Sequence, residues 1–448
     1  MVYFTGTLYW LTRVMALYGG LPVWVAVILN AALVAYLALF PAVFAVVMGR
    51  GLVAFGARAL VAAPLVWVAT ELGRAHILTG FPWVLLGYSQ AEVLPIAQLA
   101  SLFGVYGVSA LVAATSAAAA HWVVAPPGGD RLRLAATVAF LVLIVGVWGS
   151  LRVSDAEWTR AGDPVRVGLI QGNVDQAEKW DPARGAAIFQ NYLAMTRQAI
   201  DRGAGLVLWP ESSTPFYFGE ARDRAASDLL RALAKRTQVP LLFGSDQIDD
   251  GVPTRYYNSA FLLREDGSTG GVYRKMHLVP FGEYVPFKRL LFFASPLVEA
   301  VSDFSAGEEP VLLPVGGHLI STAICYEIVY PNLVRQFVLG GSELLTTITN
   351  DAWFGTTSAP YQHFAQASMR AIEGGRYLVR SANTGISGIV DPYGRILART
   401  AIDEPAVLVG DARYLQTTTL YTRVGDVVAY ASVVATVALV VLSRRRIQ

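Results

Sequence analysis

Three apolar, strand-like segments of this sequence each end at one side chain that could take part in acyl transfer. LVLWPES delivers Glu211, VYRKMHLVPFGE delivers Lys275, and ISTAICYE delivers Cys325, the single cysteine among 448 residues. A thiol can attack a carbonyl carbon, a carboxylate can take the thiol proton, and an ammonium can stabilise the negative oxygen that forms. Together these three side chains predict a site that forms a thioester.

The segment LISTAICYEIVYP, residues 319–331, is predicted to place Cys325 at the turn between a buried strand and a helix. Apolar and small residues precede the cysteine, Glu327 follows two positions later, and Pro331 opens the helical sequence NLVRQFVL. A single cysteine is often only a small core residue, and the glutamate and the lysine have ordinary structural uses as well. Because the cysteine, the glutamate and the lysine each lie at the end of an apolar strand, we interpret them together as a reactive site.

Histidine is the commoner partner of a catalytic thiol, and two histidines are alternatives to Glu211 as the base. His277 lies two residues beyond Lys275, and His363 opens a predicted helix after the NDAWFG loop. A serine nucleophile is disfavoured because the sequence has no GxSxG elbow. The five histidines show no metal-ligand spacing, and one cysteine excludes a cysteine-based zinc site and an intramolecular disulfide. We therefore expect neither a metal nor another cofactor.

The composition indicates a membrane protein. Hydrophobic residues make up 54% of the chain and charged residues 15%, whereas about 25% of the residues in typical soluble domains are charged. The apolar excess is uneven along the chain, which predicts membrane helices attached to one water-exposed domain. A net charge of +2, without a basic stripe or an RNA-binding motif, argues against a nucleic-acid partner.

Five apolar stretches are long enough to cross about 30 Å of hydrocarbon. The predicted spans are residues 21–48, 51–72, 101–124, 134–151 and 427–443. Residues 1–20 are too short and interrupted to span cleanly. Residues 73–100 mix aromatic, proline and polar residues, which favours interfacial or re-entrant structure.

Arginines beside membrane helices orient the spans, because positive charge stays on the cytoplasmic side. The links around Arg58 and Arg131 and the SRRR tail would all lie there, so the long stretch before the last span lies outside the cytoplasm. We expect membrane helices in 1–151, an extracytoplasmic catalytic domain in 152–420, and a final helix with a basic tail in 421–448. The N-terminus also falls outside with no helix before it, so we expect this start to lie within a longer parent sequence.

Strand-like and helix-like segments alternate between the fourth and fifth spans, which predicts an α/β fold. The predicted strands are residues 165–173, 205–212, 240–246, 258–266 and 343–351, with one more before the cysteine. A helix is predicted at 363–379, and a hairpin follows in GIVDPYGRIL.

Four motifs occur in an order that resembles one family of membrane enzymes. WPES, KxHLVPFGEYVPF, CYE and NDAWFG, with QGN…KWD before them and YTRVGD after them, look like the apolipoprotein N-acyltransferase family. The joint pattern is specific, because a soluble nitrilase shares only the order Glu-Lys-Cys. The resemblance implies a nitrilase-like (carbon–nitrogen hydrolase) αββα sandwich inserted between transmembrane helices. The family usually has eight membrane helices, which implies that about two precede residue 1.

The resemblance also implies roles for individual residues. Glu211 matches the general base, Lys275 the group that stabilises the oxyanion, and Cys325 the nucleophile. Glu283 and Glu327 match supporting carboxylates. The matched substrate-binding positions are Trp180, Asn258, Tyr326 and Trp353.

The activity that the resemblance implies is a two-step acyl exchange. A fatty acyl chain moves from a membrane glycerophospholipid to Cys325 as a thioester, and then to the α-amino group of the N-terminal diacylglyceryl-cysteine of an apolipoprotein. This reaction is the last step of bacterial lipoprotein maturation. We therefore expect a monomer in the bacterial cytoplasmic (inner) membrane, with its catalytic domain on the periplasmic face.

Two other functions remain open from the sequence. A membrane-tethered amidase or nitrilase would resolve the thioester with water instead of an amine. A non-catalytic receptor or transporter is disfavoured because few polar groups lie within the predicted spans. The apolar segment 284–304, between Lys275 and Cys325, is either a membrane-dipping arm that admits lipid or a buried structural excursion.

Overall fold

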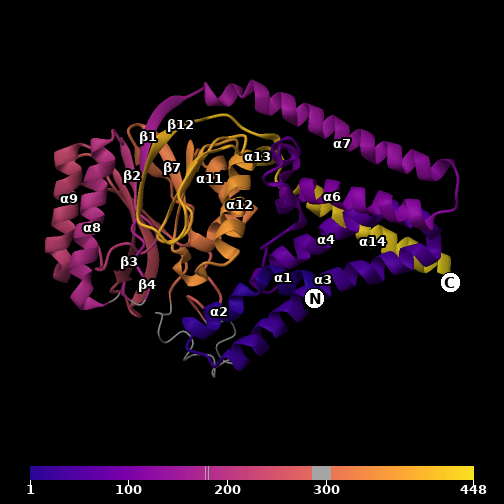
Figure 1. The fold of residues 1–448 in the computed structure, drawn as a ribbon, viewed down its shortest axis with the longest axis horizontal. Helices are drawn as coiled ribbons and strands as arrows, with labels where there is room; N and C mark the ends of the chain where they lie inside the picture. Colours follow the sequence, from indigo (N-terminus) through magenta and orange to yellow (C-terminus); the bar gives the residue numbers. More distant parts are fainter. Residues whose placement is uncertain (177, 180, 285–303, 448) are drawn as a thin grey trace.

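The computed structural model describes residues 1–176, 178–179, 181–284 and 304–447. A bundle of long helices forms one end of the molecule and two β-sheets form the other (Figure 1). The segment predicted as either a membrane-dipping arm or a buried excursion lies, apart from Tyr284 and Phe304, outside the described residues.

Five long helices form the bundle. They are α3 (Val23–Phe55), α4 (Ala63–His76), α6 (Ala100–Val124), α7 (Gly129–Asp155) and α14 (Val427–Ile447). Four helical segments of the described chain are long and apolar enough to cross a membrane, with α3 and α4 falling in one of them. These two helices nevertheless pack against each other, because Gly56, at φ +62°, and the 3₁₀ turn η1 (Gly56–Ala62) separate them.

The predicted spans agree with these helices except for 51–72, which is wrong in its bounds. It begins inside α3 and runs through the turn at Gly56 into α4, because the apolar composition continues across that turn. The regions predicted not to span contain only short helices. These are α1 (Val2–Leu8) and α2 (Trp10–Leu17), then η2 (Ile77–Thr79), η3 (Leu86–Gln90) and α5 (Leu94–Ala97).

The first sheet has six strands in the order β12-β1-β2-β3-β4-β5. Their bounds are Ala406–Tyr414 (β12), Asp163–Gln171 (β1), Leu206–Leu208 (β2), Leu241–Asp249 (β3), Arg255–Leu263 (β4) and Thr269–Arg274 (β5). Strands β1, β2 and β3 run parallel, and the other pairs are antiparallel. The catalytic candidates Glu211 and Lys275 follow β2 and β5, so both leave this sheet.

The second sheet has the order β11-β10-β9-β8-β7-β6. Its strands are Ile396–Arg399 (β11), Gly388–Val390 (β10), Leu378–Ala382 (β9), Leu344–Thr349 (β8), His318–Ile324 (β7) and Leu313–Val315 (β6). Strands β7, β8 and β9 are parallel and almost wholly apolar or small, as expected for strands covered on both faces. Cys325 follows β7 directly.

Helices cover the outer face of each sheet, which gives the four layers of an αββα sandwich (Figure 1). On the first sheet lie α8 (Pro182–Asp201) and α9 (Arg224–Thr237). On the second lie α11 (Pro331–Leu339) and α12 (Ala359–Gly374). Side chains such as Leu208, Ile320 and Ile348 from the two inner faces share one core. The predicted fold class is confirmed, although α12 begins and ends earlier than the helix predicted at 363–379.

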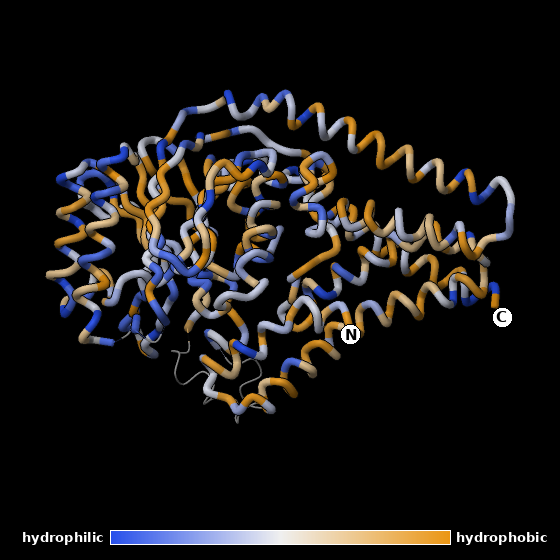
Figure 2. The backbone as a smooth tube through the Cα atoms, in the orientation of Figure 1, coloured by the Kyte–Doolittle hydropathy of each residue, from blue (hydrophilic) through white to orange (hydrophobic). Residues whose placement is uncertain are grey.

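Helix α12 also joins the sandwich to the bundle. Arg370 donates from its Nη2 to the hydroxyl of Tyr88 at 2.7 Å, and Glu373 accepts from the backbone N–H of Val105 at 2.7 Å. That N–H is available because Gly104, at φ +65°, interrupts α6. Figure 2 shows the contrast in residue hydropathy: α3 and α7 are largely hydrophobic, whereas α8 and α9 carry many hydrophilic residues.

Candidate active site

Two carboxylates and two donors form a buried ring between the sheets and the loop after β5. The Lys275 ammonium lies 3.3 Å from Oε1 of Glu211 and 2.8 Å from Oε1 of Glu283. The amide nitrogen of Asn258 donates to the same two oxygens, at 2.7 and 2.9 Å. All four side chains are at least nine-tenths buried. The structure therefore brings together Glu211, Lys275 and Glu283 as predicted, with Asn258 between the carboxylates.

Backbone groups hold this ring in place. The remaining oxygen of Glu211 accepts from the N–H of Asn350 at 2.9 Å, and that of Glu283 accepts from Val279 at 2.8 Å. The N–H of Lys275 donates to the carbonyl of Asn258 on β4 at 2.9 Å. Each carboxylate oxygen is thus satisfied, as buried charges require.

The charges within the ring determine the protonation states of Glu211 and Lys275. Burial alone would raise the pKa of Glu211, but Lys275 and Asn258 outweigh it and hold that pKa below its usual value. Burial would lower the pKa of Lys275, but Glu283 and Glu211 raise it well above the usual value. At neutral pH Glu211 is therefore a carboxylate and Lys275 an ammonium.

Cys325 has a strained backbone conformation that the contacts around it must stabilise. Its φ is +52°, in the left-handed region that non-glycine residues rarely adopt. It links β7 to the 3₁₀ helix η7 (Cys325–Val329), and α11 then begins at Pro331. This geometry resembles the exposed elbow that many enzymes use for a nucleophile, and strain of this kind is concentrated at functional sites.

Glu327 supports that elbow, and within the described residues it forms no hydrogen bond or ion pair with the four side chains of the ring. Its Oε1 accepts from the hydroxyl of Tyr273 and from the N–H groups of Met276 and His277, at 2.7 to 3.0 Å. Its Oε2 accepts from the N–H of Ile324 at 2.7 Å. Burial raises the pKa of Glu327 to about 7, against the effect of these donors. The carboxylate therefore fastens the strand before Cys325 to the loop that carries Lys275.

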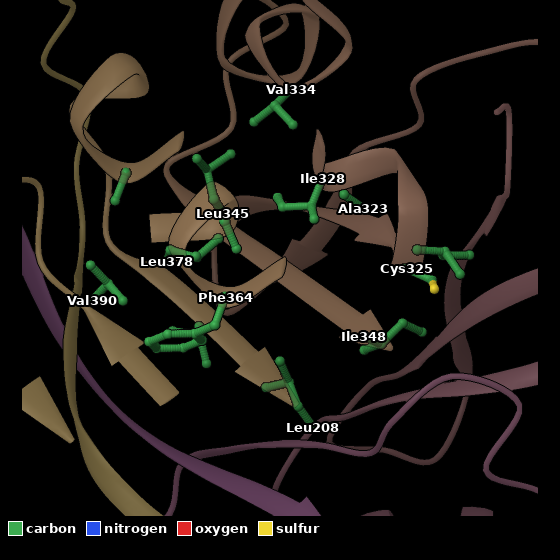
Figure 3. Packing of buried hydrophobic residues seen from close by; sticks show 14 of the residues in the cluster. Leu208, Ala323, Cys325, Ile328, Val334, Leu345, Ile348, Phe364, Leu378 and Val390 are labelled. Atoms are coloured by element: carbon green, nitrogen blue, oxygen red, sulfur yellow. The ribbon is translucent and has the colours of Figure 1, made fainter. Parts of the chain in front are cut away.

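The thiol of Cys325 lies at the edge of the apolar core, away from Leu378 and Val390 (Figure 3). Burial and Glu211 raise the pKa of the thiol, and Lys275 opposes them. Among the described residues, no hydrogen bond joins its sulfur to Glu211 or Lys275. In the resting site Cys325 is therefore a neutral thiol and Glu211 a carboxylate, and the two do not form a thiolate–acid pair.

The predicted substrate-binding residues lie in different surroundings. Tyr326 is buried, and its ring stacks on Trp83 with centroids 6.2 Å apart. Trp353 is partly exposed in the turn η8 (Asp351–Phe354) and contacts the edge of Tyr18 at 5.0 Å. Trp180 lies outside the described residues. Asn258 uses its amide nitrogen on the two carboxylates, so a substrate contact there stays a prediction.

The two histidines predicted as alternative bases have other partners. The ring of His277 packs 3.8 Å from that of Tyr330, and burial together with Lys275 lowers the pKa of His277 to about 4. His363 is fully buried, and its Nε2 lies 3.1 Å from the carbonyl oxygen of Cys325, which is backbone and not thiol. Neither contact supports a role as base.

Several residues at the site were missed by sequence reasoning. Lys179, within the KWD motif, donates to the carbonyl of Glu211 at 3.3 Å. Asp246 accepts from Ser212 at 2.9 Å, and burial raises the pKa of Asp246 to about 6. Asn350 supplies its backbone N–H to Glu211. The motifs KWD and NDAWFG were the available signal, but a motif does not say which of its groups turn inward.

Comparison with known proteins agrees with this geometry. A family model described as carbon-nitrogen hydrolase matches residues 166–418, and one described as the apolipoprotein N-acyltransferase N-terminal domain matches residues 1–118. The apolipoprotein N-acyltransferase of Geobacter metallireducens is 41% identical over 99% of this chain and 85% of that protein. That of Methylococcus capsulatus is 36% identical over 98% of this chain and 84% of that protein. The chain belongs to the apolipoprotein N-acyltransferase family.

Solved structures similar to this member of the apolipoprotein N-acyltransferase family include two from the nitrilase superfamily. An amidase from Nesterenkonia sp. is 24% identical over 57% of this chain and 93% of that chain, with a TM-score of 0.43. Nit3 of Saccharomyces cerevisiae is 19% identical over 56% of this chain and 90% of that chain, with a TM-score of 0.45.

Membership of the apolipoprotein N-acyltransferase family confirms the main sequence prediction. The chain is an acyltransferase with a carbon–nitrogen hydrolase domain. Its apolar helices and its bacterial relatives make it a bacterial membrane protein. The roles of individual residues and the substrates are proposals, which follow.

Proposed function

We propose that this enzyme moves a fatty acyl chain from a membrane glycerophospholipid to Cys325 and then to the α-amino group of an apolipoprotein's N-terminal diacylglyceryl-cysteine. The observation that carries the proposal is the buried ring of Glu211, Lys275 and Glu283 in the same sandwich as the strained elbow at Cys325. A carboxylate, an ammonium and a thiol supply the base, the electrophile and the nucleophile of acyl transfer.

In the first step, the sulfur of Cys325 bonds to the carbonyl carbon of an acyl ester, at sn-1 of the lipid. The thiol proton passes to the carboxylate of Glu211, and Lys275 and a backbone N–H of the elbow hold the oxyanion. The C–O bond then breaks, and the leaving alkoxide takes the proton back from Glu211. The products are a lysophospholipid and a thioester on Cys325.

In the second step, the lipoprotein amine attacks the thioester carbonyl. Its extra proton passes to Glu211, the C–S bond breaks, and the departing sulfur takes that proton. The result is an amide on the lipoprotein and a free thiol on Cys325. Water in place of the amine would give the hydrolysis expected of a tethered amidase.

The shifted pKa values of the site favour transfer of the thiol proton while the sulfur attacks the ester, and not before. Since the pKa of Cys325 is raised and that of Glu211 is lowered, a separate thiolate is unfavourable in the resting enzyme. Sulfur–carbon bond formation moves the negative charge from the thiol to the carbonyl oxygen, where the fixed ammonium of Lys275 favours it. Such a thiol is protected from adventitious reaction until an acyl ester arrives.

We also propose that the sandwich lies on the periplasmic face of the inner membrane. Arg58 pairs with Asp130 at 3.3 Å, and Arg446 donates to the carbonyl of Ala54 at 3.4 Å. These contacts join the links after α3 and α6 to the C-terminal tail, and the C-terminus lies at the end of the bundle farthest from the sheets (Figure 1). Positive charge marks the cytoplasmic side, which supports an extracytoplasmic domain within 152–420, a membrane part in 1–151 and a final helix in 421–448.

The decisive experiment is the intact mass of the purified protein after incubation with phospholipid. We expect the mass to rise by one acyl chain, mapped to Cys325 and released by hydroxylamine. A diacylated lipopeptide amine should discharge it, whereas water alone should do so slowly. Cys325→Ala should remain folded and unlabelled. A hydroxylamine-labile acyl group on Cys325→Ala would overturn the proposal, and rapid discharge by water would favour the amidase.

A further inference from the structure

A chain of four buried groups runs from β9 to the peptide that follows the nucleophile. Nη2 of Arg380 lies 2.9 Å from Oδ2 of Asp351 and 3.0 Å from Nδ1 of His363. Nδ1 is also 3.1 Å from Oδ1 of Asp351, and Nε2 is 3.1 Å from the carbonyl oxygen of Cys325. Arg380, Asp351 and His363 are fully buried, so these bonds are shielded from bulk solvent.

The partners of His363 determine which ring nitrogen carries the proton. A carbonyl oxygen can only accept, so Nε2 must be the N–H that donates to Cys325. Nδ1 lies between Arg380, which can only donate, and the carboxylate of Asp351, which can only accept. In a neutral ring with its proton on Nε2, Nδ1 accepts from Arg380. Oδ1 of Asp351 is engaged by the hydroxyl of Thr349 at 2.9 Å. Burial and Arg380 lower the pKa of His363, so the ring is neutral.

This bond sets the direction of one backbone N–H. In a trans peptide the carbonyl and the next N–H point to opposite sides. Because His363 on α12 holds the carbonyl of Cys325, the N–H of Tyr326 points away from α12. Tyr326 is the second residue of η7, and N–H groups in the first turn of a helix have no acceptor within that helix.

We propose that His363 is a positioning residue that aims the N–H of Tyr326 at the oxyanion, and that Arg380 fixes the ring in the Nε2–H form required for this. The inference rests on the proposed acyl transfer. His363 touches neither substrate nor sulfur, so it acts through the Cys325–Tyr326 peptide. The geometry also accounts for the left-handed φ of Cys325, because the anchored carbonyl helps to hold that conformation.

The first test compares His363→Gln with His363→Phe. The amide nitrogen of glutamine can donate from near the position of Nε2, whereas phenylalanine keeps the ring shape without a donor. We expect His363→Phe to slow thioester formation at saturating lipid at least about tenfold, since a lost oxyanion donor costs ~10²–10³. His363→Gln should stay within about fivefold of wild type. The lipid concentration at half-maximal rate should be unchanged in both.

Arg380→Met provides the second variant. Without Arg380, the carboxylate of Asp351 draws the proton to Nδ1, and the lone pair of Nε2 then faces the carbonyl of Cys325. We expect this variant to lose rate as His363→Phe does. In a His363→Gln background, where no tautomer exists, Arg380→Met should cause little further loss. Additive losses would overturn the role of Arg380.

A spectroscopic measurement keeps the inference testable if a variant fails to fold. In wild-type protein labelled with ¹⁵N-histidine, the signal absent from His363→Gln or another folded variant at this position should show protonated Nε2 and unprotonated Nδ1. Protonated Nδ1 would overturn the proposal, as would equal rates for His363→Phe and wild type. A wild-type protein that forms no thioester would instead refute the proposed function, whatever tautomer is found.

Discussion

Asn258 and Lys275 donate to the same pair of carboxylate oxygens, one from Glu211 and one from Glu283. Two carboxylates that share a site normally push one pKa upward, because like charges repel. Here one ammonium and one amide lie between them, and the pKa of Glu211 stays below its usual value. The neutral amide of Asn258 therefore acts together with Lys275 to keep Glu211, the proposed base, ionised.

Removing that amide should change the pH dependence of acylation. Glu211 must be ionised to accept a proton, and its pKa is held below the usual value, so activity persists at neutral pH and is lost as the pH falls through that pKa. Asn258→Leu removes a donor that lowers the pKa. We expect the acid limb of the thioester-formation rate to move to higher pH. Ser259→Ala, whose hydroxyl bonds to Gln247 instead, is the control, and an unmoved limb in Asn258→Leu would contradict the prediction.

Glu211→Gln should abolish most of the chemistry while leaving lipid binding intact. Loss of a general base typically costs ~10²–10⁴ in rate, and glutamine can still accept from Lys275. Single-turnover measurement of the acyl-thioester gives the rate directly. Asp228→Asn, an exposed substitution on α9, is the matched control for removal of one negative charge. An unchanged rate in Glu211→Gln would remove Glu211 as the base.

Glu327→Gln should destabilise the elbow, because all four groups around Glu327 are donors. The amide nitrogen of glutamine would face one of them, and an unsatisfied buried donor costs about 1–3 kcal/mol. We expect a lower apparent melting temperature and slower acylation together. Glu343→Gln is the control, since its partner His318 can switch tautomer. Equal melting temperatures for the two variants would contradict this account.

The packing of the N-terminal helices against the sandwich should depend on one glutamine of α12. Oε1 of Gln362 accepts from the indoles of Trp83 and Trp10, at 2.8 and 3.3 Å, and its Nε2 donates to Thr7. Gln362→Leu leaves the buried indole of Trp83 without its acceptor, whereas the indole of Trp10 keeps the carbonyl of Thr7 at 3.0 Å. The substitution should lower the melting temperature by several degrees. Limited proteolysis should then cut the N-terminal helices sooner.

Gln366 lies one turn further along α12 and is the matched control for that experiment. Its Oε1 has no partner among the described residues, and its Nε2 bonds only to the carbonyl of Gln362. Gln366→Leu should therefore be nearly neutral. If both variants unfold alike, the loss comes from the changed packing of α12 and not from the indole contacts.

Cysteine labelling should reveal the orientation in the membrane. The only native cysteine is buried, so Cys325→Ala gives a clean background. Asp228→Cys on α9 should react with a membrane-impermeant maleimide in intact spheroplasts. Gly129→Cys, at the first residue of α7, where an added Cβ meets nothing within 4 Å, should react only after lysis. The reverse pattern would place the sandwich in the cytoplasm.

Much of this fold follows from local sequence. Apolar length predicts the helices of the bundle, and strand ends predict where Glu211, Lys275 and Cys325 lie. The turn at Gly56 escaped prediction because one backbone dihedral, and not a change in composition, ends α3. The buried contacts of Asn350 and His363 also escaped it, since each depends on tertiary packing that brings together segments distant in sequence.

Helix α12 (Ala359–Gly374) contacts the backbone of Cys325 near its start and the membrane helix α6 near its end. His363 bonds to the carbonyl of Cys325 in its first turns, and Glu373 accepts from Val105 in its last. Sixteen residues of α-helix span about 24 Å and resist compression. If the Cys325–Tyr326 peptide binds the oxyanion as proposed, a change of bilayer thickness that shifts α6 is expected to reach that peptide through α12. Lipid composition would then affect the acylation rate through the position of α6 as well as through the supply of acyl chains.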